Sequence, residues 1–380
     1  MTGFTLNEEQ LALQKKAREF ADTQMRPYAG EIDRVPSPLF DWRVVERFAA
    51  AGFTQLCIPQ EYGGIGAGSL TTAIVCEELA VACAGMSTVL AGSMLAINCL
   101  RSGGTPEQKS QYLPVLADKR GKLGALAITE TGAGSDMGSI ATIAKPAKDG
   151  YSLSGSKYYI SNAGIAELYI VLATTEPAKK YAGLDLFIVP AGTPGLSTGK
   201  IEDKLGLRAS QTAELIFDNV RVPSSAVVGR PGTGFLATMQ ALDLSRPAAA
   251  VCSIGISRAA YEAALDYTKK RVQFGRPLFK NQAVAFALVD MVTNIDAARL
   301  LAWRACHLID SGEEFTAEAS MAKLFASETA ERVTSQAMHL VGAAGYSHDL
   351  PLEKYYRDAK AMTILEGSSE IQRHIIAGEL

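Results

Sequence analysis

The feature that most constrains the fold is a double change in the spacing of apolar residues along the chain. Up to about residue 122 they recur every three or four positions, as on one face of a helix. Residues 123–229 instead form short segments rich in Tyr, Ile, Val and Phe, separated by turn pairs such as Asp149-Gly150. Helical spacing then returns and persists to the end, so the predicted order is helices, strands, helices.

This order predicts an α+β protein, because the strands are grouped together and do not alternate with helices. The chain has 380 residues, which is too many for one simple core. We expect an N-terminal helical domain over 1–122, an antiparallel β domain over 123–229 and a C-terminal helical bundle over 230–380. The expected strands are Gly124–Ile128, Tyr151–Leu153, Lys157–Ile160, Leu168–Ala173, Leu184–Val189 and Ala213–Val222.

Several helix boundaries can be predicted from local signals. Asn7 with Gln10 three residues later is typical of a capping box. A helix over Leu39–Ala51 is expected to end at the glycine that follows it. The small apolar stretch Ser69–Leu100 predicts a buried helix with a break near Ala84-Gly85.

Composition excludes several classes of function. The net charge of −3 and the absence of a long Lys/Arg run argue against a nucleic-acid partner. The six cysteines form no CxxC pair and lie in apolar segments, which predicts buried free thiols in a reducing compartment. The four histidines lack ligand spacing, so no metal site is expected. No targeting segment is evident and no apolar run approaches a membrane span, so we expect a cytoplasmic protein.

Common cofactor and nucleophile motifs are missing. Gly132, Gly134 and Gly138 do not have the G-x-G-x-x-G spacing of a dinucleotide-binding loop. There is no P-loop and no G-x-S-x-G elbow. The loop AITETGAGSDM at 127–137 combines hydroxyl groups with small residues, as would suit a flavin ring, although an ordinary polar turn fits the same residues. RVQFGRPLFKNQ at 271–282 fits a phosphate or nucleotide site, or a plain corner between helices.

One carboxylate near the C-terminus has a distinctive setting. Glu366 follows an apolar run and precedes Gly367 and two serines, where a helix ends and a turn begins. Taken alone, this pattern favours an exposed acid beside a serine that caps the last helix. The other interpretation is a base whose pKa is raised by a dry environment.

Six motifs together resemble the acyl-CoA dehydrogenase family, in its order and spacing and over nearly the whole chain. The segment LDLSRP at 242–247 is most similar to its medium- and short-chain members. The motifs are TETGAGSD at 129–136, YYISN at 158–162, KLGLRASQTAEL at 204–215, FDNVRVP at 217–223, RVQFGRPL at 271–278 and RDAK…LEGSSEIQR at 357–373.

The resemblance implies FAD bound between the β domain and a C-terminal four-helix bundle, with part of its ADP half held by a neighbouring subunit of a homotetramer. Thr129 would contact the pyrimidine edge of the flavin, Ser161 would lie near its reactive nitrogen and Tyr159 would flank the ring. Arg271, Gln273 and Phe274 would reach the ADP side from the partner subunit. The full implied cofactor set is Leu126, Thr129, Ser135, Tyr159, Ser161, Arg271, Gln273, Phe274, Gln282, His339, Gly342, Ser368 and Glu370.

The reaction implied is removal of hydrogens from the alpha and beta carbons of an acyl-CoA thioester, giving a 2,3-enoyl-CoA. Glu366 would abstract the alpha proton while flavin N5 takes the beta hydride. Some members of the family carry the base at the position of Ser245. A serine cannot serve as this base, so Glu366 is left as the candidate. The implied substrate-binding residues are Ser135, Asp243, Arg246, Leu365 and Gly367.

The chain departs from the family pattern at Thr131, Tyr159, His339, Ala343 and Leu365, where Pro, Trp, Gln, Gly and Tyr are usual. Leu365, beside the base, leads us to expect a bulkier or less usual acyl group. A second carboxylate on that group is not expected, because the segment SRP offers no arginine beyond the one on the CoA side. The expected acceptor is an electron-transfer flavoprotein. Alternatives are an acyl-CoA oxidase, an enoyl-CoA reductase or a non-catalytic flavin-binding subunit.

Overall fold

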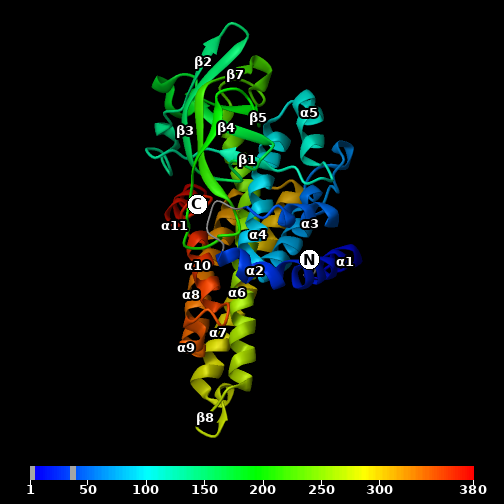
Figure 1. Cartoon of the computed structure of the whole chain (residues 1–380), viewed down its shortest axis with the longest axis vertical. Helices are drawn as coiled ribbons and strands as arrows, with labels where there is room; N and C mark the ends of the chain where they lie inside the picture. The colour runs from blue at the N-terminus through cyan, green and yellow to red at the C-terminus, as the bar shows by residue number, and fades with distance from the viewer. Residues whose placement is uncertain (1–4, 35–39) are drawn as a thin grey trace.

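The computed structural model describes residues 5–34 and 40–380 and is elongated, with a β domain at one end and long helices extending from it (Figure 1). The capping box at Asn7 and Gln10 is confirmed. A turn of π-helix, Ala21–Met25, joins the first two helices. The helices before the sheet are α1 (Glu8–Phe20), α2 (Arg26–Arg34), α3 (Arg43–Ala51), α4 (Ser69–Gly103) and α5 (Pro106–Leu116).

Helix α3 ends as predicted, at Gly52 in the left-handed conformation, φ 82°. Its predicted start at Leu39 lies outside the described residues, and the helix observed begins at Arg43. The break predicted in α4 near Ala84-Gly85 is confirmed, and it falls at Cys83, where φ is −161° and ψ is 107°. All six cysteines are free and buried, as expected.

Helix α4 corrects one expectation. It is long and apolar enough by length and composition to cross a membrane, with a mean hydropathy of 1.8 over its most apolar stretch. However, 83% of that stretch is buried inside the protein, as in the core helix of a folded domain. The prediction that no apolar run reaches this length is therefore wrong, and packing explains the run.

Seven strands of the described chain form one sheet, in the order β1-β4-β2-β3-β7-β6 with β5 paired to β4. Most pairs are antiparallel as expected, but β1 and β2 run parallel to β4. The predicted strands Tyr151–Leu153 and Lys157–Ile160 are parts of one continuous strand, β3, which contains bulges. Strands β2 and β6 were not predicted, because Lys, Ser and Gly interrupt the usual alternation of apolar residues. The strands are β1 (Gly124–Ala127), β2 (Ile143–Ala147), β3 (Gly150–Ser161), β4 (Leu168–Thr174), β5 (Leu184–Pro190), β6 (Leu196–Ile201) and β7 (Thr212–Pro223).

The sheet is buried on both faces at its centre. Along β4, Leu168, Ile170 and Leu172 join the large core shared with the helices, while Tyr169 and Val171 join a separate core within the β domain. This alternation follows from the two-residue period of a strand. One face of the sheet therefore lies against the helices, and the ends of β1 and β3 lie close to them.

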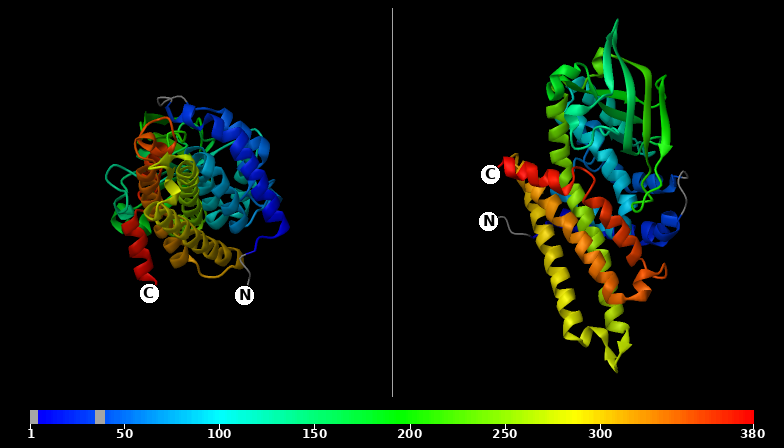
Figure 2. Two further views of the ribbon diagram at one scale, coloured as in Figure 1. Left: turned by 90° about the horizontal axis from the view of Figure 1, so that it is seen from below. Right: turned by 90° about the vertical axis from the view of Figure 1, so that its left-hand side faces the viewer.

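The C-terminal helices pack lengthwise below the sheet (Figure 2). In α7, Leu288, Met291, Ile295 and Ala298 are buried, which confirms the predicted helical face. A small hairpin of β8 (Val272–Gln273) and β9 (Arg276–Pro277) lies at the end of the bundle away from the sheet (Figure 1). The helices are α6 (Gly234–Lys270), α7 (Gln282–Ser311), α8 (Thr316–Val341), α9 (Ala343–Tyr346), α10 (Leu352–Met362) and α11 (Ser369–Gly378).

Candidate active site

The turn that carries Glu366 is held in an unusual conformation. Glu366 has φ +53° and Gly367 has φ +90°, both in the left-handed region. A non-glycine residue there is uncommon and typical of functional sites. Lys323 donates to the Gly367 carbonyl at 2.6 Å, and Gln372 donates to the carbonyls of both turn residues at 3.1 Å. Two buried side chains thus fix the backbone from which the carboxylate projects.

The Glu366 carboxylate has one hydrogen-bond donor among the described side chains, the Ser245 hydroxyl, at 2.9 Å. Burial raises the pKa of Glu366 to about 7, against the opposing effects of Ser245, Lys323 and Arg246. Burial also lowers the pKa of Lys323 to about 8. The exposed-acid interpretation of Glu366 is therefore wrong, because the tertiary fold leaves this residue only partly exposed. A carboxylate with a pKa near neutrality and a single hydroxyl partner is suited to accept a proton.

A small cavity of about 40 Å³ opens beside Glu366. It lies between α4, α6 and the segment that precedes α4, and most of its lining side chains are small. Arg101 is the one cation in this lining. The lining residues are Cys57, Ala67, Ser69, Thr72, Ala73, Ala91, Met94, Asn98, Arg101, Leu244, Ser245, Pro247, Ala248 and Glu366.

The residues predicted to face a flavin gather where the loop after β1 meets β3. The Tyr158 amide donates to the Thr129 carbonyl at 2.8 Å, which joins the two segments, and Leu126 precedes this loop in β1. Tyr159 has φ +58° and leaves 64% of its surface exposed. A Cβ at Gly132 or Gly134 would meet nothing within 4 Å, so the loop faces open space. Open space beside hydroxyls and an exposed, strained aromatic residue fits a flat ring ligand.

The predicted CoA residues lie in two places. Asp243 pairs with Arg246 one turn along α6 and accepts a hydrogen bond from Thr316 at 3.0 Å. Arg246 is buried and its Nε has no partner among the described residues, so one donor stays available. Ser135 is exposed on the loop after β1. These roles remain predictions.

The other predicted cofactor residues fall into a near group and a distant group. Ser368 caps α11, and Glu370 is exposed on its first turn, close to Glu366 in sequence. The hairpin β8–β9 lies at the far end of the bundle from the β domain (Figure 1). Phe274 at its tip is 99% exposed with φ +55°. The distant group is Arg271, Gln273, Phe274, Gln282, His339 and Gly342, at the hairpin and the nearby helix ends.

Sequence reasoning missed the residues that hold the Glu366 turn. Lys323 is fully buried, although it lies among the alanines that form the inward face of α8. A lone Lys on an otherwise apolar helical face was the available signal. Gln372 gave no such signal, because a polar residue in the first turn of a helix is ordinary.

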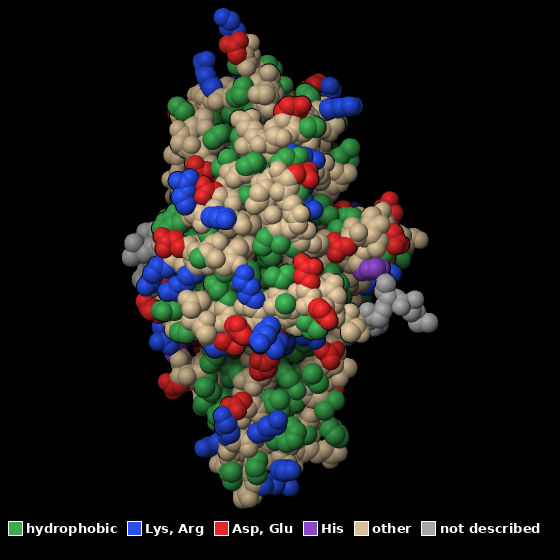
Figure 3. Space-filling model, turned by 90° about the vertical axis from the view of Figure 1, so that its right-hand side faces the viewer, with side chains coloured by type: hydrophobic (Ala, Val, Ile, Leu, Met, Phe, Trp, Pro, Cys, Tyr) green, Lys and Arg blue, Asp and Glu red, His purple; other side chains and the backbone are tan. Residues whose placement is uncertain are grey.

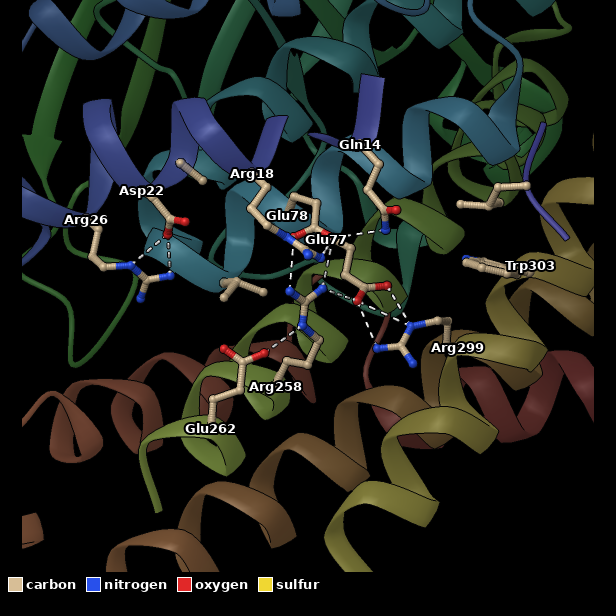
Figure 4. Close-up of a pocket in the computed structure, with 13 residues that line it drawn as sticks. Gln14, Arg18, Asp22, Arg26, Glu77, Glu78, Arg258, Glu262, Arg299 and Trp303 are labelled. Atoms are coloured by element: carbon tan, nitrogen blue, oxygen red, sulfur yellow. Dashed lines mark hydrogen bonds and ion pairs between the residues drawn. The ribbon is translucent and has the colours of Figure 1, made fainter. Parts of the chain in front are cut away.

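A much larger cleft, of about 560 Å³, lies among α1, α4, α6 and α7 (Figure 4). Arg18 and Arg258 both bind Glu78, at distances down to 2.7 Å, and Arg258 and Arg299 both bind Glu77. Burial would raise the pKa of Glu78, but the hydrogen bonds and charges of the two arginines outweigh it and the pKa is lowered. Each acid that lines this cleft therefore forms an ion pair with an arginine.

Comparison with known proteins identifies the fold and the family. Family models for the acyl-CoA dehydrogenase N-terminal, middle and C-terminal domains match residues 7–120, 125–220 and 232–380. Acryloyl-CoA reductase (NADH) of Anaerotignum propionicum is 42% identical, over 99% of this chain and 95% of its own. Short-chain specific acyl-CoA dehydrogenase of Bos taurus is 40% identical, over 99% and 90%.

The structure of butyryl-CoA dehydrogenase from Megasphaera elsdenii gives a TM-score of 0.96 at 38% identity, covering 100% of this chain and 99% of that one. A structure titled for the electron transferring flavoprotein of Acidaminococcus fermentans gives the same TM-score at 37% identity, with the same coverage. Matches at this level extend over all three regions of the fold and over the segment that carries Glu366. The chain belongs to the acyl-CoA dehydrogenase family.

Proposed function

We propose that this protein is an FAD-dependent oxidoreductase that dehydrogenates an acyl-CoA thioester between its alpha and beta carbons. One observation carries the proposal: Glu366 projects into a cavity with only a hydroxyl partner, and its pKa is raised to about 7. A carbon acid next to a thioester carbonyl needs a positioned base of this strength. Apolar side chains of α4 and α6, such as Ala91, Met94 and Leu244, form part of the cavity wall, where an acyl chain can pack.

The turn geometry suits the second requirement of the reaction, a polarised thioester carbonyl. Lys323 and Gln372 hold the carbonyls of the turn, and the Glu366 amide makes no hydrogen bond within the described residues. In the proposal the Glu366 amide donates to the thioester oxygen as negative charge develops there. Leu365 and Gly367 flank this donor in the chain, and in the proposal both contact the acyl group.

The proposed cofactor is FAD, held by Thr129, Tyr159 and Ser161, with Ser368 and Glu370 nearby. Bound FAD supplies the acceptor for the hydride that leaves the beta carbon. Ser135, Asp243 and Arg246 would hold the CoA moiety, with the free Nε of Arg246 as one donor. Leu126 would support the flavin loop from β1.

The proposal includes a second copy of the chain, because one chain separates the flavin loop from the hairpin at the other end of the bundle (Figure 1). Arg271, Gln273 and Phe274 would reach the ADP half of the partner's cofactor, with Gln282, His339 and Gly342 beside them. Phe286 and Val289 on α7 are more than half exposed, and hydrophobic side chains gather over the bundle (Figure 3). Such a surface suits subunit contacts. We propose a homotetramer in the cytoplasm.

The proposed electron acceptor is an electron-transfer flavoprotein, which one matching structure names in its own title. A second candidate function is reduction of a 2,3-enoyl-CoA by the same site. It is favoured by the 42% identity to acryloyl-CoA reductase (NADH). The base assignment serves both directions, since Glu366 would return the proton that it takes.

The test is an anaerobic titration of the purified yellow holoenzyme with butyryl-CoA and longer saturated thioesters. Bleaching of the flavin absorbance by at least one thioester supports the proposal. A holoenzyme that no saturated thioester bleaches, but whose dithionite-reduced flavin is reoxidised by crotonyl-CoA, would favour the reductase. A holoenzyme inert to both kinds of thioester would refute both functions.

A further inference from the structure

The cavity beside Glu366 contains a cation that the proposed reaction does not use. Arg101 lines it together with Asn98 and Thr72. The Thr72 hydroxyl is buried and has no hydrogen-bond partner among the described residues. Asn98 is also buried, and its carbonyl oxygen is 3.4 Å from an Arg101 nitrogen, a long contact. An acyl pocket meant only for a hydrocarbon tail has no need of these groups.

The packing of α4 against α6 sets the distance between Arg101 and the proposed base. Residues 91, 94, 98 and 101 of α4 all line the cavity, spaced by three, four and three positions, so they share one face. Helices α4 and α6 run antiparallel, since Gly255 lies against Ala80 and Gly103 against Ala237. Counted from the contact of Gly103 with Ala237, which lies on the same side of the break at Cys83 as Arg101, a rise of 1.5 Å per residue places Arg101 about 9 Å along the helix pair from the level of Ser245. A short acyl chain and an arginine side chain together span such a gap.

The charge of Arg101 is not neutralised within the cavity. No carboxylate in residues 5–34 or 40–380 forms an ion pair with it, whereas the arginines of the larger cleft each hold an acid. The Arg101 side chain is exposed to solvent at the edge of this cavity, so its guanidinium carries little desolvation penalty there. Its planar fork matches a carboxylate in geometry.

We propose that the acyl group taken by this site is short and ends in a carboxylate, which Arg101 binds with help from Thr72 and Asn98. This inference rests on the proposed function and specifies its substrate class. It departs from the expectation drawn from the segment SRP at 245–247. The arginine for a second carboxylate comes from α4, more than a hundred residues earlier in the chain, and only the fold brings it beside Glu366.

The experiment compares two thioesters of equal chain length, glutaryl-CoA and pentanoyl-CoA, on the FAD-loaded enzyme. We expect the wild type to prefer glutaryl-CoA in kcat/KM. Arg101→Met should lower kcat/KM for glutaryl-CoA by roughly 10- to 100-fold, the usual effect of losing a hydrogen bond to a charged group. Its kcat/KM for pentanoyl-CoA should stay within a few fold or rise. Arg101→Lys should lie between the two, because it keeps the charge and loses the fork.

The matched control is Arg221→Met, which removes one positive charge from an exposed position on β7 and so changes the net charge equally. It should leave both thioesters unaffected, and an equal loss there would mean that overall charge, and not the cavity, attracts the anion. A wild type that clearly prefers pentanoyl-CoA, or an Arg101→Met variant that loses both activities equally, overturns the inference.

Binding separates this inference from the proposed function. In a Glu366→Gln background, which retains the cavity, the dissociation constants of both thioesters can be measured with and without Arg101→Met. An Arg101-dependent preference for glutaryl-CoA without flavin bleaching in the wild type would support the site and refute the reaction. Bleaching without any such preference would support the reaction and refute the site.

Discussion

Two cavities in the described part of the chain shift the pKa of their acids in opposite directions. In the large cleft, Glu78 receives hydrogen bonds from two arginines, and its pKa is lowered. In the small cavity, Glu366 receives one from a hydroxyl, and its pKa is raised to about 7. The larger and more charged cleft is thus a structural ion-pair network, while the smaller one holds the proposed base. Partners, and not cavity size, decide which buried acid can serve as a base.

The largest expected effect is on catalysis. Glu366→Gln should lower kcat by roughly 10²–10⁴-fold while flavin content stays unchanged, because the amide cannot accept the alpha proton. Steady-state assays and the flavin spectrum measure the two quantities. Glu379→Gln, an exposed acid on the same C-terminal segment, is the control and should keep full activity. Full turnover by Glu366→Gln would show that another group is the base.

The opposite result is expected in the large cleft, where removing an acid should damage stability more than chemistry. Glu78→Gln removes the anionic partner of Arg18 and one of the two buried anionic partners of Arg258, which keeps Glu77, and should lower the free energy of unfolding by about 3 kcal/mol. This is the lower end for a buried pair, because Arg18 is half exposed. Urea unfolding at pH 7 measures it. Unchanged stability would mean that the network contributes nothing net.

The pH dependence of stability should distinguish the same two acids. Glu366 has a raised pKa, so the native state binds more protons than the unfolded chain between about pH 4.5 and 7, and stability falls as pH rises through that window. Glu366→Gln should therefore be more stable than the wild type at pH 8 and equal to it near pH 4. Glu78 has a lowered pKa, and its contribution should be present above its ordinary pKa and be lost on acidification. Unfolding titrations at several pH values test both signs.

A smaller effect is expected from the one hydroxyl partner of Glu366. In the wild type, kcat/KM should rise with pH through about 7, because the base must be ionised. Ser245→Ala removes a donor that stabilises the anion and should move this rise upward by about one pH unit. Activity should then be lost near pH 6.5 and recovered above pH 8.5. Loss at every pH would instead indicate that Ser245 positions the substrate.

The smallest expected effect concerns the turn itself. Gly367→Ala would place a Cβ about 2.7 Å from the Gln372 amide nitrogen at φ +90°, so the turn must shift. We expect a loss of about 1 kcal/mol in the free energy of unfolding. We also expect a reduced kcat, since the amide and carboxylate of Glu366 move with the turn. Unfolding curves and steady-state kinetics separate the two, and unchanged kinetics would remove this turn from the proposed oxyanion contact.

Much of the architecture could be predicted from local patterns. The capping box at Asn7, the glycine that ends α3 and the buried face of α7 follow from spacing that the chain itself carries. The parallel pairing of β1 with β4 could not be predicted, because strand order depends on contacts between segments more than forty residues apart. Missed strands β2 and β6 contain Lys, Ser and Gly in place of the usual alternation.

The sequence by itself determined the three-part order, the family motifs and Glu366 as the candidate base, because these depend on residues close together in the chain or on motifs in register. Only the tertiary structure decided that Glu366 is half-buried with a raised pKa, that Lys323 fixes its turn and that Arg101 lines its cavity. The physical reason is that burial and electrostatic partners depend on packing among α4, α6, α8 and the C-terminal turn. Residues that are distant in sequence meet there, and their spacing along the chain carries no record of the contact.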